Sequence, residues 1–490
     1  MPNNRGPSKG CRRCRELKVK CDENKPSCHR CRKGDHDCVY RSQFDLVHRD
    51  QNSVAQAAAT RKWRQRAEAQ PSVDIINIII PKSLGIPLSE LAYNRLYFDF
   101  VIPWPGTLSR LRQQLRETTP DSCLVSVVAA VAYANFHGRC NSSGAKSASR
   151  VHYGQALQRL ATTMTSAVEM QRDEILMVIW LLGMYEMLTS SSRDGSWVTH
   201  MKGTQSVLAH RDKKNLKDDD NYLAVLCMNL IFFYLAETKA PPPHLRHWIQ
   251  QIPFPQAFKK QLVAAMSDAA AACSNLRERS KYRSASPIEE LDAADLDLVQ
   301  EALTIDLKLQ SWGHTLPPEW GKISTHPITN HHRPSWTREL LTSPGAPKYA
   351  TRYPNRLAAC DSNACRATRL LLHMEILSFI STFSSPILAL TTLQSHSRGV
   401  LITLTIEIAC SVPYALDISS DGKSDPATPT EVPGLCAYRI IWPVFTGLIC
   451  LQNDLVKSED FAQTAQWFRT ILRFLRDTMG IAKVNVFLKK

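Results

Sequence analysis

Six cysteines fall within residues 11–38, and their spacing constrains what this part of the chain can fold into. The segment reads CRRCRELKVKCDENKPSCHRCRKGDHDC, so the pattern C-x2-C-x6-C occurs twice, with six residues between the copies. In each copy two cysteines are close enough to share one helical turn, and a third returns from the loop that follows. This grouping predicts a metal centre that binds its ions from two directions, with the ligands Cys11, Cys14, Cys21, Cys28, Cys31 and Cys38.

The number of sulfur atoms limits how metals can be bound here. Structural zinc takes four ligands in a tetrahedron, so two Zn²⁺ require eight ligand positions, and six thiolates suffice only if two of them bridge the metals. His29 or His36 could instead complete a site, and disulfide pairing is a further alternative. The chain starts with MPNNRGPSKG, which lacks the apolar stretch of a secretory signal. We therefore expect a reducing compartment and two Zn²⁺ as cofactors.

The cysteine pattern resembles that of the fungal binuclear zinc-cluster family of transcription factors. The resemblance implies that the first and fourth cysteines, Cys11 and Cys28, bridge the two metals. It also implies that Lys18, three residues before the third cysteine, reads guanines of a CGG-type triplet, since an ammonium group can donate to guanine O6 and N7. Pro26 occupies the place of the proline that commonly shapes the loop between the halves. Leu17 stands where many relatives carry a second basic residue, which leaves the triplet preference open.

The basic residues around the cysteines favour double-stranded DNA as the partner. Residues 1–50 contain 13 Lys/Arg and 7 Asp/Glu, and the whole chain has a formal net charge of +15. A positive surface attracts phosphate and releases counterions on binding. We expect a first helix from about Arg12 to Leu17 at the major groove, and a zinc module that contacts proteins instead of DNA is the alternative. The expected phosphate contacts, which position the module without reading sequence, are Lys9, Arg12, Arg13, Arg15 and Lys20.

A polar, alanine-rich and basic segment follows the module. We expect a zinc-cluster DNA-binding domain over residues 1–40, a partly helical linker over 41–83 and a regulatory domain over 84–490. Family members often carry a dimerising coiled coil after the cluster, but the linker sustains no leucine heptad, so a homodimer is only a possible partner arrangement. The RKWRQR run over residues 61–66 is a nuclear-import signal, an accessory DNA contact or a charged helix face.

The rest of the chain shows apolar residues at three- and four-residue spacing, which is typical of helices. Asp121 and Asp173 are candidate N-caps or first-turn acids, and polar loops are expected over 274–287 and 418–433. No segment shows the alternation of apolar and polar residues that is typical of strands. The predicted fold is therefore a small metal-stabilised binuclear zinc-cluster module followed by a large all-α domain. The predicted helices cover residues 121–137, 152–164, 173–188, 221–237 and 296–312.

A second resemblance lies in this helical region. The stretches over residues 181–211 and 307–320 are similar to the helical regulatory domain of many fungal transcription factors. The two resemblances together imply a sequence-specific regulator in the nucleus, which acts on RNA polymerase II transcription through contacts with the transcription machinery. By the same analogy its targets are a metabolic or secondary-metabolite gene set.

Signals for catalysis or for a membrane span are missing from the sequence. There is no phosphate-binding glycine loop, nucleophile elbow or histidine pair with an acid partner, and His200 and His210 are expected to pack or to form surface hydrogen bonds. We therefore expect no enzyme. The longest apolar stretches, over residues 175–188 and 223–236, are shorter than the roughly 18 residues of a membrane helix, so no membrane partner is expected.

Overall fold

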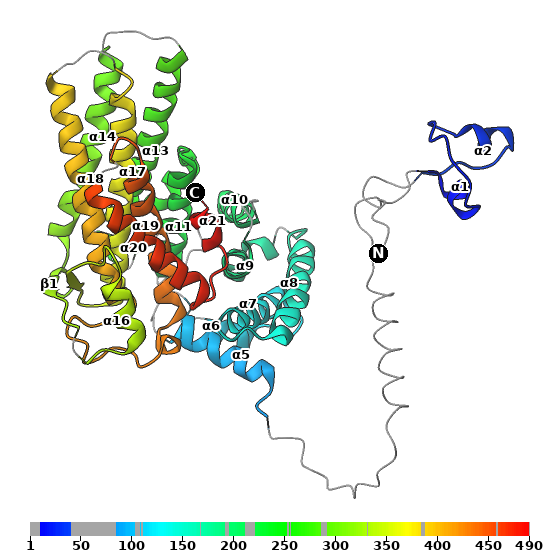
Figure 1. Cartoon of the computed structure of the whole chain (residues 1–490), viewed down its shortest axis with the longest axis horizontal. Helices are drawn as coiled ribbons and strands as arrows, with labels where there is room; N and C mark the ends of the chain where they lie inside the picture. Colours follow the sequence, from blue (N-terminus) through cyan, green and yellow to red (C-terminus); the bar gives the residue numbers. More distant parts are fainter. Residues whose placement is uncertain are drawn as a thin grey trace, which may run out of the picture. The chain divides into compact units, whose positions relative to one another are not determined.

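The chain divides into two compact units, Met1–Gly85 and Ile86–Lys490, which are described separately (Figure 1). The linker predicted over residues 41–83, with its basic run, and Lys9 lie outside the described residues, so their roles stay predictions. The computed structural model describes residues 10–40, 85–102, 108, 111–166, 168–191, 196–210, 221–251, 254, 256–285, 292–330, 332–383, 388–456 and 459–489.

Two five-residue helices form the regular structure described in the N-terminal unit. Helix α1 (Arg12–Glu16) follows Cys11 and helix α2 (His29–Lys33) follows Cys28, so the N-cap of each helix is a cysteine. The sequence predicts the first helix through Leu17, but the helix ends one residue earlier, with Leu17 as its C-cap. The difference is one residue at a helix end, where boundaries are least determined by sequence.

Both short helices end in the same way. The residue after each C-cap adopts the left-handed conformation, with φ of 52° at Lys18 and 50° at Asp35. The backbone N–H of the next residue then donates to the carbonyl of the second cysteine in that half, at 2.9 Å in the first half and 3.0 Å in the second. This is the Schellman arrangement, which satisfies carbonyls at a helix end. The two halves therefore share one backbone design, and each residue of the first corresponds to the residue 17 positions later.

The larger unit consists mainly of helices. Their bounds are α5 (Leu88–Leu96), the π-helix η1 (Tyr97–Val101), α6 (Leu111–Glu117), α7 (Cys123–Cys140), α8 (Ser143–Thr163), η2 (Glu169–Gln171), α9 (Asp173–Thr189), α10 (Ser196–Ala209), α11 (Asn221–Glu237), α12 (Pro243–Gln251), α13 (Ala257–Ala285), α14 (Ala293–Trp312), η4 (Gly313–Thr315), α15 (Pro318–Gly321), α16 (Ser335–Thr342), α17 (Arg356–Ile380), α18 (Leu388–Ala415), η5 (Pro429–Glu431), α19 (Gly434–Gln452), α20 (Glu459–Asp477) and α21 (Val484–Leu488). The helical fold class and the five predicted helices are confirmed, in α7, α8, α9, α11 and α14.

Several local predictions need correction. The N-cap of α7 is Ser122 rather than Asp121, and its hydroxyl accepts a hydrogen bond from a backbone N–H at 3.1 Å. Asp173 is the first residue of α9, as predicted for a first-turn acid.

The domain also contains two four-residue strands, β1 (Ser324–Pro327) and β2 (Tyr349–Arg352), which pair antiparallel. Strands this short carry too few residues for an alternating pattern to show in the sequence.

The polar loop predicted over residues 274–287 is wrong, because α13 continues as a helix to Ala285. Its polar end is stabilised by ion pairs with other elements, which local sequence does not reveal. Arg279 Nε lies 2.8 Å from Asp295 Oδ1 on α14, and Arg277 Nε lies 3.2 Å from Glu375 Oε2 on α17. By contrast, the segment over 418–433 is a loop as predicted, apart from the short turn η5.

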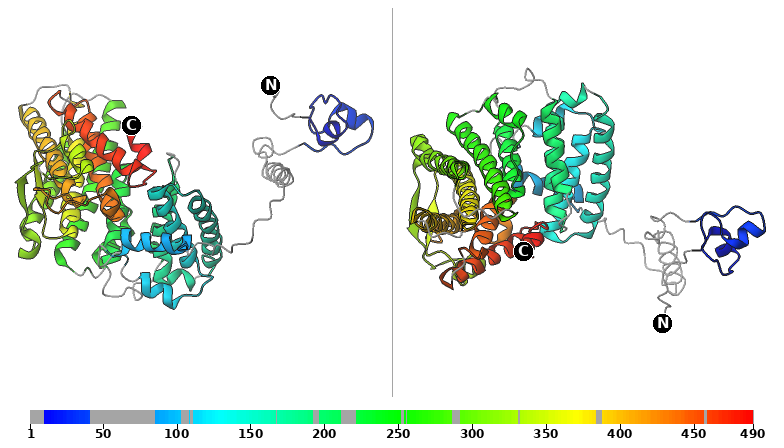
Figure 2. Two further views of the ribbon diagram at one scale, coloured as in Figure 1. Left: turned by 60° about the horizontal axis from the view of Figure 1, so that its bottom comes forward. Right: turned by 90° about the horizontal axis from the view of Figure 1, so that it is seen from above.

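Two groups of helices pack around one core. Helices α13, α14, α17 and α18 lie side by side, and α7 packs against α5, α8 and α9 in the other group (Figure 2). Helix α19 contacts α17, α18 and α20. A large cluster of buried apolar side chains extends from Ala92 in α5 to Phe487 in α21, and a small second cluster lies at the start of α17. Both groups of helices therefore contribute to one large shared hydrophobic core.

Three of the described helices, α7, α18 and α19, are long and apolar enough to cross a membrane by length and composition alone. Of their apolar windows, 61%, 50% and 83% are buried inside the protein. Their apolar faces thus pack, in large part, against the other helices of the domain. The expectation of no membrane partner stays a prediction.

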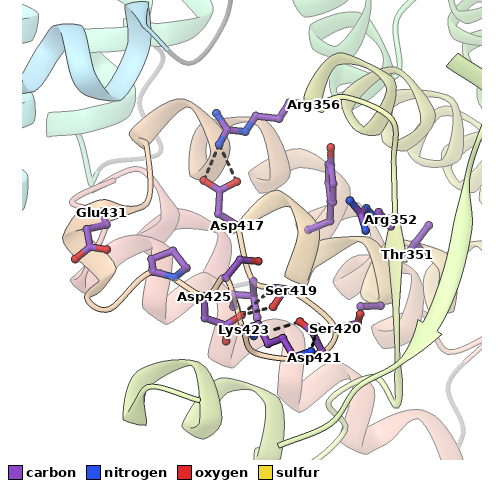
Figure 3. Close-up of a pocket in the computed structure, with 15 residues that line it drawn as sticks. Thr351, Arg352, Arg356, Asp417, Ser419, Ser420, Asp421, Lys423, Asp425 and Glu431 are labelled. Carbon is purple, nitrogen blue, oxygen red and sulfur yellow. Dashed lines mark hydrogen bonds and ion pairs between the residues drawn. The ribbon is translucent and has the colours of Figure 1, made fainter. Parts of the chain in front are cut away.

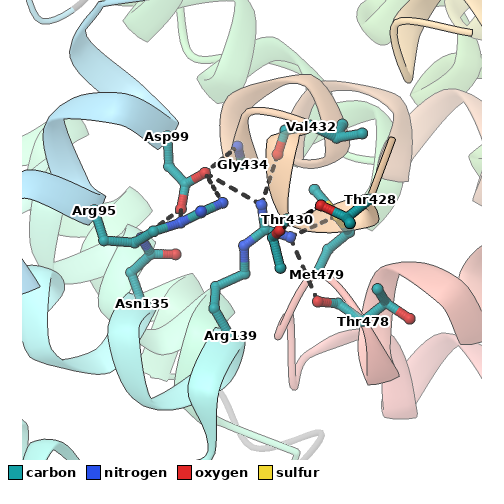
Figure 4. Close-up of polar contacts among 10 residues, drawn as sticks. All are labelled: Arg95, Asp99, Asn135, Arg139, Thr428, Thr430, Val432, Gly434, Thr478 and Met479. Carbon is teal, nitrogen blue, oxygen red and sulfur yellow. Dashed lines mark hydrogen bonds and ion pairs between the residues drawn. The ribbon is translucent and has the colours of Figure 1, made fainter. Parts of the chain in front are cut away.

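A buried carboxylate, Asp99 in η1, connects distant parts of the helical domain (Figure 4). Asp99 is 0% exposed and accepts hydrogen bonds from Arg95 Nε at 2.7 Å and from Asn135 Nδ2 on α7 at 2.8 Å. The backbone N–H of Gly434, the first residue of α19, donates to the same carboxylate at 2.8 Å. One side chain therefore joins the beginning of the domain to a helix more than 300 residues later.

Arg139, near the end of α7, extends this network. Its Nη2 lies 3.3 Å from Asp99 Oδ1 and donates to the carbonyl of Val432 at 2.6 Å, while Nη1 donates to the carbonyl of Thr478 at 3.4 Å. Burial lowers the pKa of Arg139, and the neighbouring Asp99 carboxylate opposes that shift. The arginine remains a buried cation whose counter-charge is Asp99.

Asp99→Asn should strongly destabilise the helical domain, because it removes the negative charge that compensates Arg95 and Arg139. Loss of one member of a buried ion pair costs about 3–5 kcal/mol. We expect a decrease of that size in the free energy of unfolding, measured by urea titration of the helical circular dichroism signal. As the matched control, Glu278→Gln removes an acid from an exposed pair with Lys281, and its cost should stay below about 1 kcal/mol. Equal losses for the two variants would contradict the role of Asp99.

Candidate metal centre and nucleic-acid interface

The six predicted cysteine ligands converge in the N-terminal unit. Their sulfur atoms form two groups of four, and within each group all four atoms lie within 4.8 Å of one another. Cys11 and Cys28 belong to both groups. The first group is Cys11, Cys14, Cys21 and Cys28, and the second is Cys11, Cys28, Cys31 and Cys38.

The sulfur separations fit tetrahedral zinc. A Zn–S distance of about 2.3 Å places two ligand sulfurs of a tetrahedron about 3.8 Å apart. The Sγ of Cys11 lies 3.8 Å from that of Cys28 and 3.7 Å from that of Cys31, and the Sγ of Cys14 lies 3.8 Å from that of Cys28. A disulfide requires about 2.05 Å, so these sulfurs are not bonded to one another. His29 and His36 are exposed and join neither group.

Hydrogen bonding and burial shift the pKa values of the cysteine thiols in opposite directions. The N–H of Cys28 donates to the Sγ of Cys38 at 3.2 Å, and this hydrogen bond lowers the pKa of Cys38 to about 7. Burial has the opposite effect on Cys14, whose pKa it raises to about 12. The thiolate is the form that binds metal. A divalent cation in the group would therefore stabilise the thiolates that burial disfavours.

Two further residues shape the module and were missed by the sequence analysis. The carboxylate of Asp22 accepts the N–H of His29, the first residue of α2, at 3.1 Å, and this hydrogen bond lowers the pKa of Asp22. Tyr40 donates from its hydroxyl to the carbonyl of Asn24 at 2.9 Å. Both contacts cross a loop, so no periodic pattern indicates them. For Asp22 the available signal was an acidic residue ahead of a helix N-terminus, where negative charge is stabilising.

The basic residues between the cysteines differ in how they are placed. Lys18 is exposed at the left-handed position that ends α1, and Arg13 and Lys20 are also exposed. Arg12 forms an exposed ion pair with Glu16 at 2.9 Å. The half-buried Arg15 donates from Nε to the carbonyl of the first cysteine at 3.4 Å. The structure thus brings the described DNA-contact candidates together on α1 and the turn that follows it.

The two halves of the module differ in charge where their backbones correspond. Asp35 occupies the position in the second half that Lys18 occupies in the first, with the same left-handed backbone. Seventeen residues after Lys20 the chain has Asp37. These carboxylates repel phosphate, whereas the lysines attract it. At these corresponding positions the loop of the first half is therefore positive and the loop of the second half is negative.

A buried arrangement in the helical domain superficially resembles a catalytic triad. His373 Nδ1 lies 3.2 Å from Ser397 Oγ, and its Nε2 lies 3.2 Å from Asp306 Oδ2. Burial raises the pKa of Asp306, but contacts with His373 and Arg369 outweigh it and hold that pKa at about 2. His373 and Ser397 are 0% exposed. A nucleophile sealed in the core has no access to substrate, so this cluster is part of the packing.

The two histidines singled out in the sequence are placed as expected. His200 Nε2 lies 3.2 Å from the hydroxyl of Tyr153, which donates to Glu186 at 2.5 Å, and burial lowers the pKa of His200. His210 is exposed, and its Nδ1 lies 2.8 Å from the carbonyl of Ser206. These contacts are packing and surface hydrogen bonds.

Comparison with known proteins identifies both units. Residues 9–46 match the model of the fungal Zn(2)-Cys(6) binuclear cluster domain. Residues 103–473, most of the chain, match the model of the fungal specific transcription factor domain. No curated protein and no solved structure matches the chain. Both resemblances drawn from the sequence are confirmed, and so is the expectation that the protein is not an enzyme. The chain belongs to the fungal zinc-cluster transcription factors: it binds zinc and DNA and regulates transcription.

Proposed function

We propose that the N-terminal module binds two Zn²⁺ through its six cysteines, with Cys11 and Cys28 as the bridging thiolates. The observation that carries this proposal is that these two residues alone, among the described ligand candidates, belong to both groups of four sulfurs. Cys14 and Cys21 complete one tetrahedron, and the last two cysteines complete the other. Bound zinc fixes the positions of α1, α2 and the loops between them, and supplies no chemistry to a substrate.

We further propose that α1 and the turn after it recognise a CGG-type triplet in the major groove, with Lys18 as the base-reading residue. Two observations support this assignment: the exposure of Lys18 at the end of α1, and the acidic residue at the corresponding place in the second half. A lysine ammonium in the groove can donate to the guanine acceptors. The proposed phosphate contacts, which orient the module, are Lys9, Arg12, Arg13, Arg15 and Lys20.

The family supports a wider proposal about the role in the cell. The protein acts in the nucleus on RNA polymerase II transcription, and its helical domain contacts the transcription machinery. Its targets are a metabolic or secondary-metabolite gene set, and the proposed DNA-binding, linker and regulatory regions are residues 1–40, 41–83 and 84–490. A homodimer is one way to recognise two triplets, since dimer spacing sets the separation of half-sites. Mapping of bound sites across the genome tests both the targets and the half-site spacing.

Cys28→Ala should remove zinc from the module and unfold it, because the lost sulfur is a proposed ligand of both metals. Metal analysis of the purified full chain should find two zinc ions in the wild type and fewer than one in the variant. Cys140→Ala is the matched control, since Cys140 is an exposed cysteine at the end of α7, and this variant should keep both ions. A folded Cys28→Ala protein with two zinc ions would refute the bridging assignment.

Lys18→Ala should weaken binding to a CGG-containing duplex by about 1–3 kcal/mol, or roughly 5- to 150-fold, while non-specific affinity changes little. Lys20→Ala, two residues away, should weaken binding to both duplexes by a similar factor, because a phosphate contact carries no sequence information. Gel-shift titrations with CGG-containing and scrambled duplexes at one salt concentration measure the two effects. Equal losses on both duplexes for Lys18→Ala would exclude it as a base reader, and no preference in the wild type would exclude CGG recognition.

A further inference from the structure

Leu17, a large apolar side chain of the zinc module, lies exposed beside the proposed base reader. It is 60% exposed and directly precedes Lys18 at the end of α1. Contact of apolar surface with water is unfavourable, but single exposed leucines are common in proteins. Exposure alone therefore assigns no role to Leu17, and its role depends on what the fold of the module requires at this position.

The fold of the module does not depend on the side chain of Leu17. Leu17 is the C-cap of α1, and it contributes to the helix end through its backbone N–H, which donates to the carbonyl of Arg13 at 3.0 Å. The apolar contact that often accompanies a Schellman end comes from the half-buried Val19, which packs against the buried cysteines. Within residues 10–40, which the structure describes, Leu17 is not among the side chains packed against those cysteines.

The second half of the module forms the same helix end without any side chain at this position. Gly34, which lies 17 residues after Leu17, is the C-cap of α2. The N–H two residues after this glycine donates to the carbonyl of the second cysteine of that half at 3.0 Å, and the equivalent distance in the first half is 2.9 Å. The turn therefore closes with either residue, so the leucine side chain is available for a contact outside the module.

The surroundings of Leu17 are charged, which decides between the partners that an apolar side chain can have. Glu16, Lys18 and Lys20 lie within three residues of it and are exposed. The centre of a protein–protein interface is depleted of charged residues, so this surface matches neither an apolar partner protein nor a second copy of the chain. The major groove of DNA offers phosphates to the lysines and, to the leucine, the C5-methyl group that distinguishes thymine among the four bases.

We propose that Leu17 contacts the methyl group of a thymine in a base pair next to the guanines read by Lys18. This inference rests on the proposed placement of α1 and its turn in the major groove. Consecutive Cα atoms are about 3.8 Å apart and stacked base pairs about 3.4 Å apart, so neighbouring residues can reach neighbouring base pairs. The lysine then recognises guanine acceptors, and the leucine recognises a methyl group. Leu17 is thus a specificity-determining residue that adds a thymine to the recognised sequence.

Selection of duplexes followed by removal of single methyl groups tests the proposal. The full-length, zinc-loaded protein first selects duplexes from a random pool. Each thymine of the selected sequence is then replaced by uracil, which differs from thymine only in lacking the C5-methyl group. Replacement of one thymine next to the guanines should weaken binding by the wild type about fourfold, as expected for the loss of one buried methyl group. Gel-shift titrations at one salt concentration measure the affinities.

Leu17→Ala separates this contact from the rest of the interface. The variant should bind the thymine duplex about as weakly as the wild type binds the uracil duplex, and uracil replacement should change its affinity little. Val39→Ala is the matched control, because Val39 is a similarly exposed apolar residue, at 59%, whose carbonyl accepts the N–H of Arg12 at the other end of α1. This variant should keep the wild-type preference for thymine. Zinc analysis and circular dichroism verify that both variants are folded.

The outcomes distinguish failure of this contact from failure of CGG recognition. The proposal is overturned by a selected sequence with no thymine next to its guanines, by a wild type indifferent to uracil, or by equal uracil effects in Leu17→Ala and Val39→Ala. In each of these cases a selected CGG would leave triplet recognition intact. A selected sequence that lacks CGG contradicts the proposed triplet, and the uracil comparison at the thymines beside the selected guanines still decides for or against Leu17.

Discussion

Convergence of six sulfur atoms is the constraint from which the structure of the N-terminal module follows. Over residues 10–40, which the structure describes, the module has almost no other core: the buried cluster consists of Cys11, Cys14, Cys28 and Cys31, with a few partly buried side chains around them. Thiolates this close repel one another, and two divalent cations would reverse that repulsion. Structural zinc contributes on the order of 10 kcal/mol to folding, which a core of this size cannot supply. Metal binding and folding of the module are thus one process.

The metal arrangement also determines where the proposed DNA-contact residues lie. Each helix begins directly after a shared cysteine, so the proposed bridging thiolates set the start of α1 and α2. Each helix is closed by the same turn, which places Lys18 in one half and Asp35 in the other at equivalent points. Near-symmetry of the backbone with asymmetry of charge means that only one half presents a basic turn. The repeated cysteine spacing gives the two halves the same backbone, whereas the lysine in one half and the aspartate in the other give their turns opposite charges.

The features predictable from sequence are those that depend on neighbours in the chain. The cysteine groups could be predicted because ligand spacing is local, and α9 and α11 because their apolar residues recur at helical spacing. The polar end of α13 was mistaken for a loop because its stability comes from partners such as Asp295, on another helix. The role of Asp22 was missed for the same reason, since its partner is the N–H of a helix across a loop. Long-range polar contacts leave no periodic signal in the sequence.

Buried polar contacts of this long-range kind also hold the loop before α19 against the rest of the helical domain. This loop, which contains Asp425 and borders a cavity (Figure 3), is held by Arg333 at Asp425 and by Arg139 at the carbonyl of Val432. Between these two points the chain has only a few residues, so their positions cannot vary independently. The second point belongs to the Asp99 network, which joins α7 to the start of α19 (Figure 4). The loop before α19 and the contacts of Asp99 with α7 and α19 therefore share Arg139. Rearranging either one would break buried polar contacts of this residue, which are costly to leave unmade.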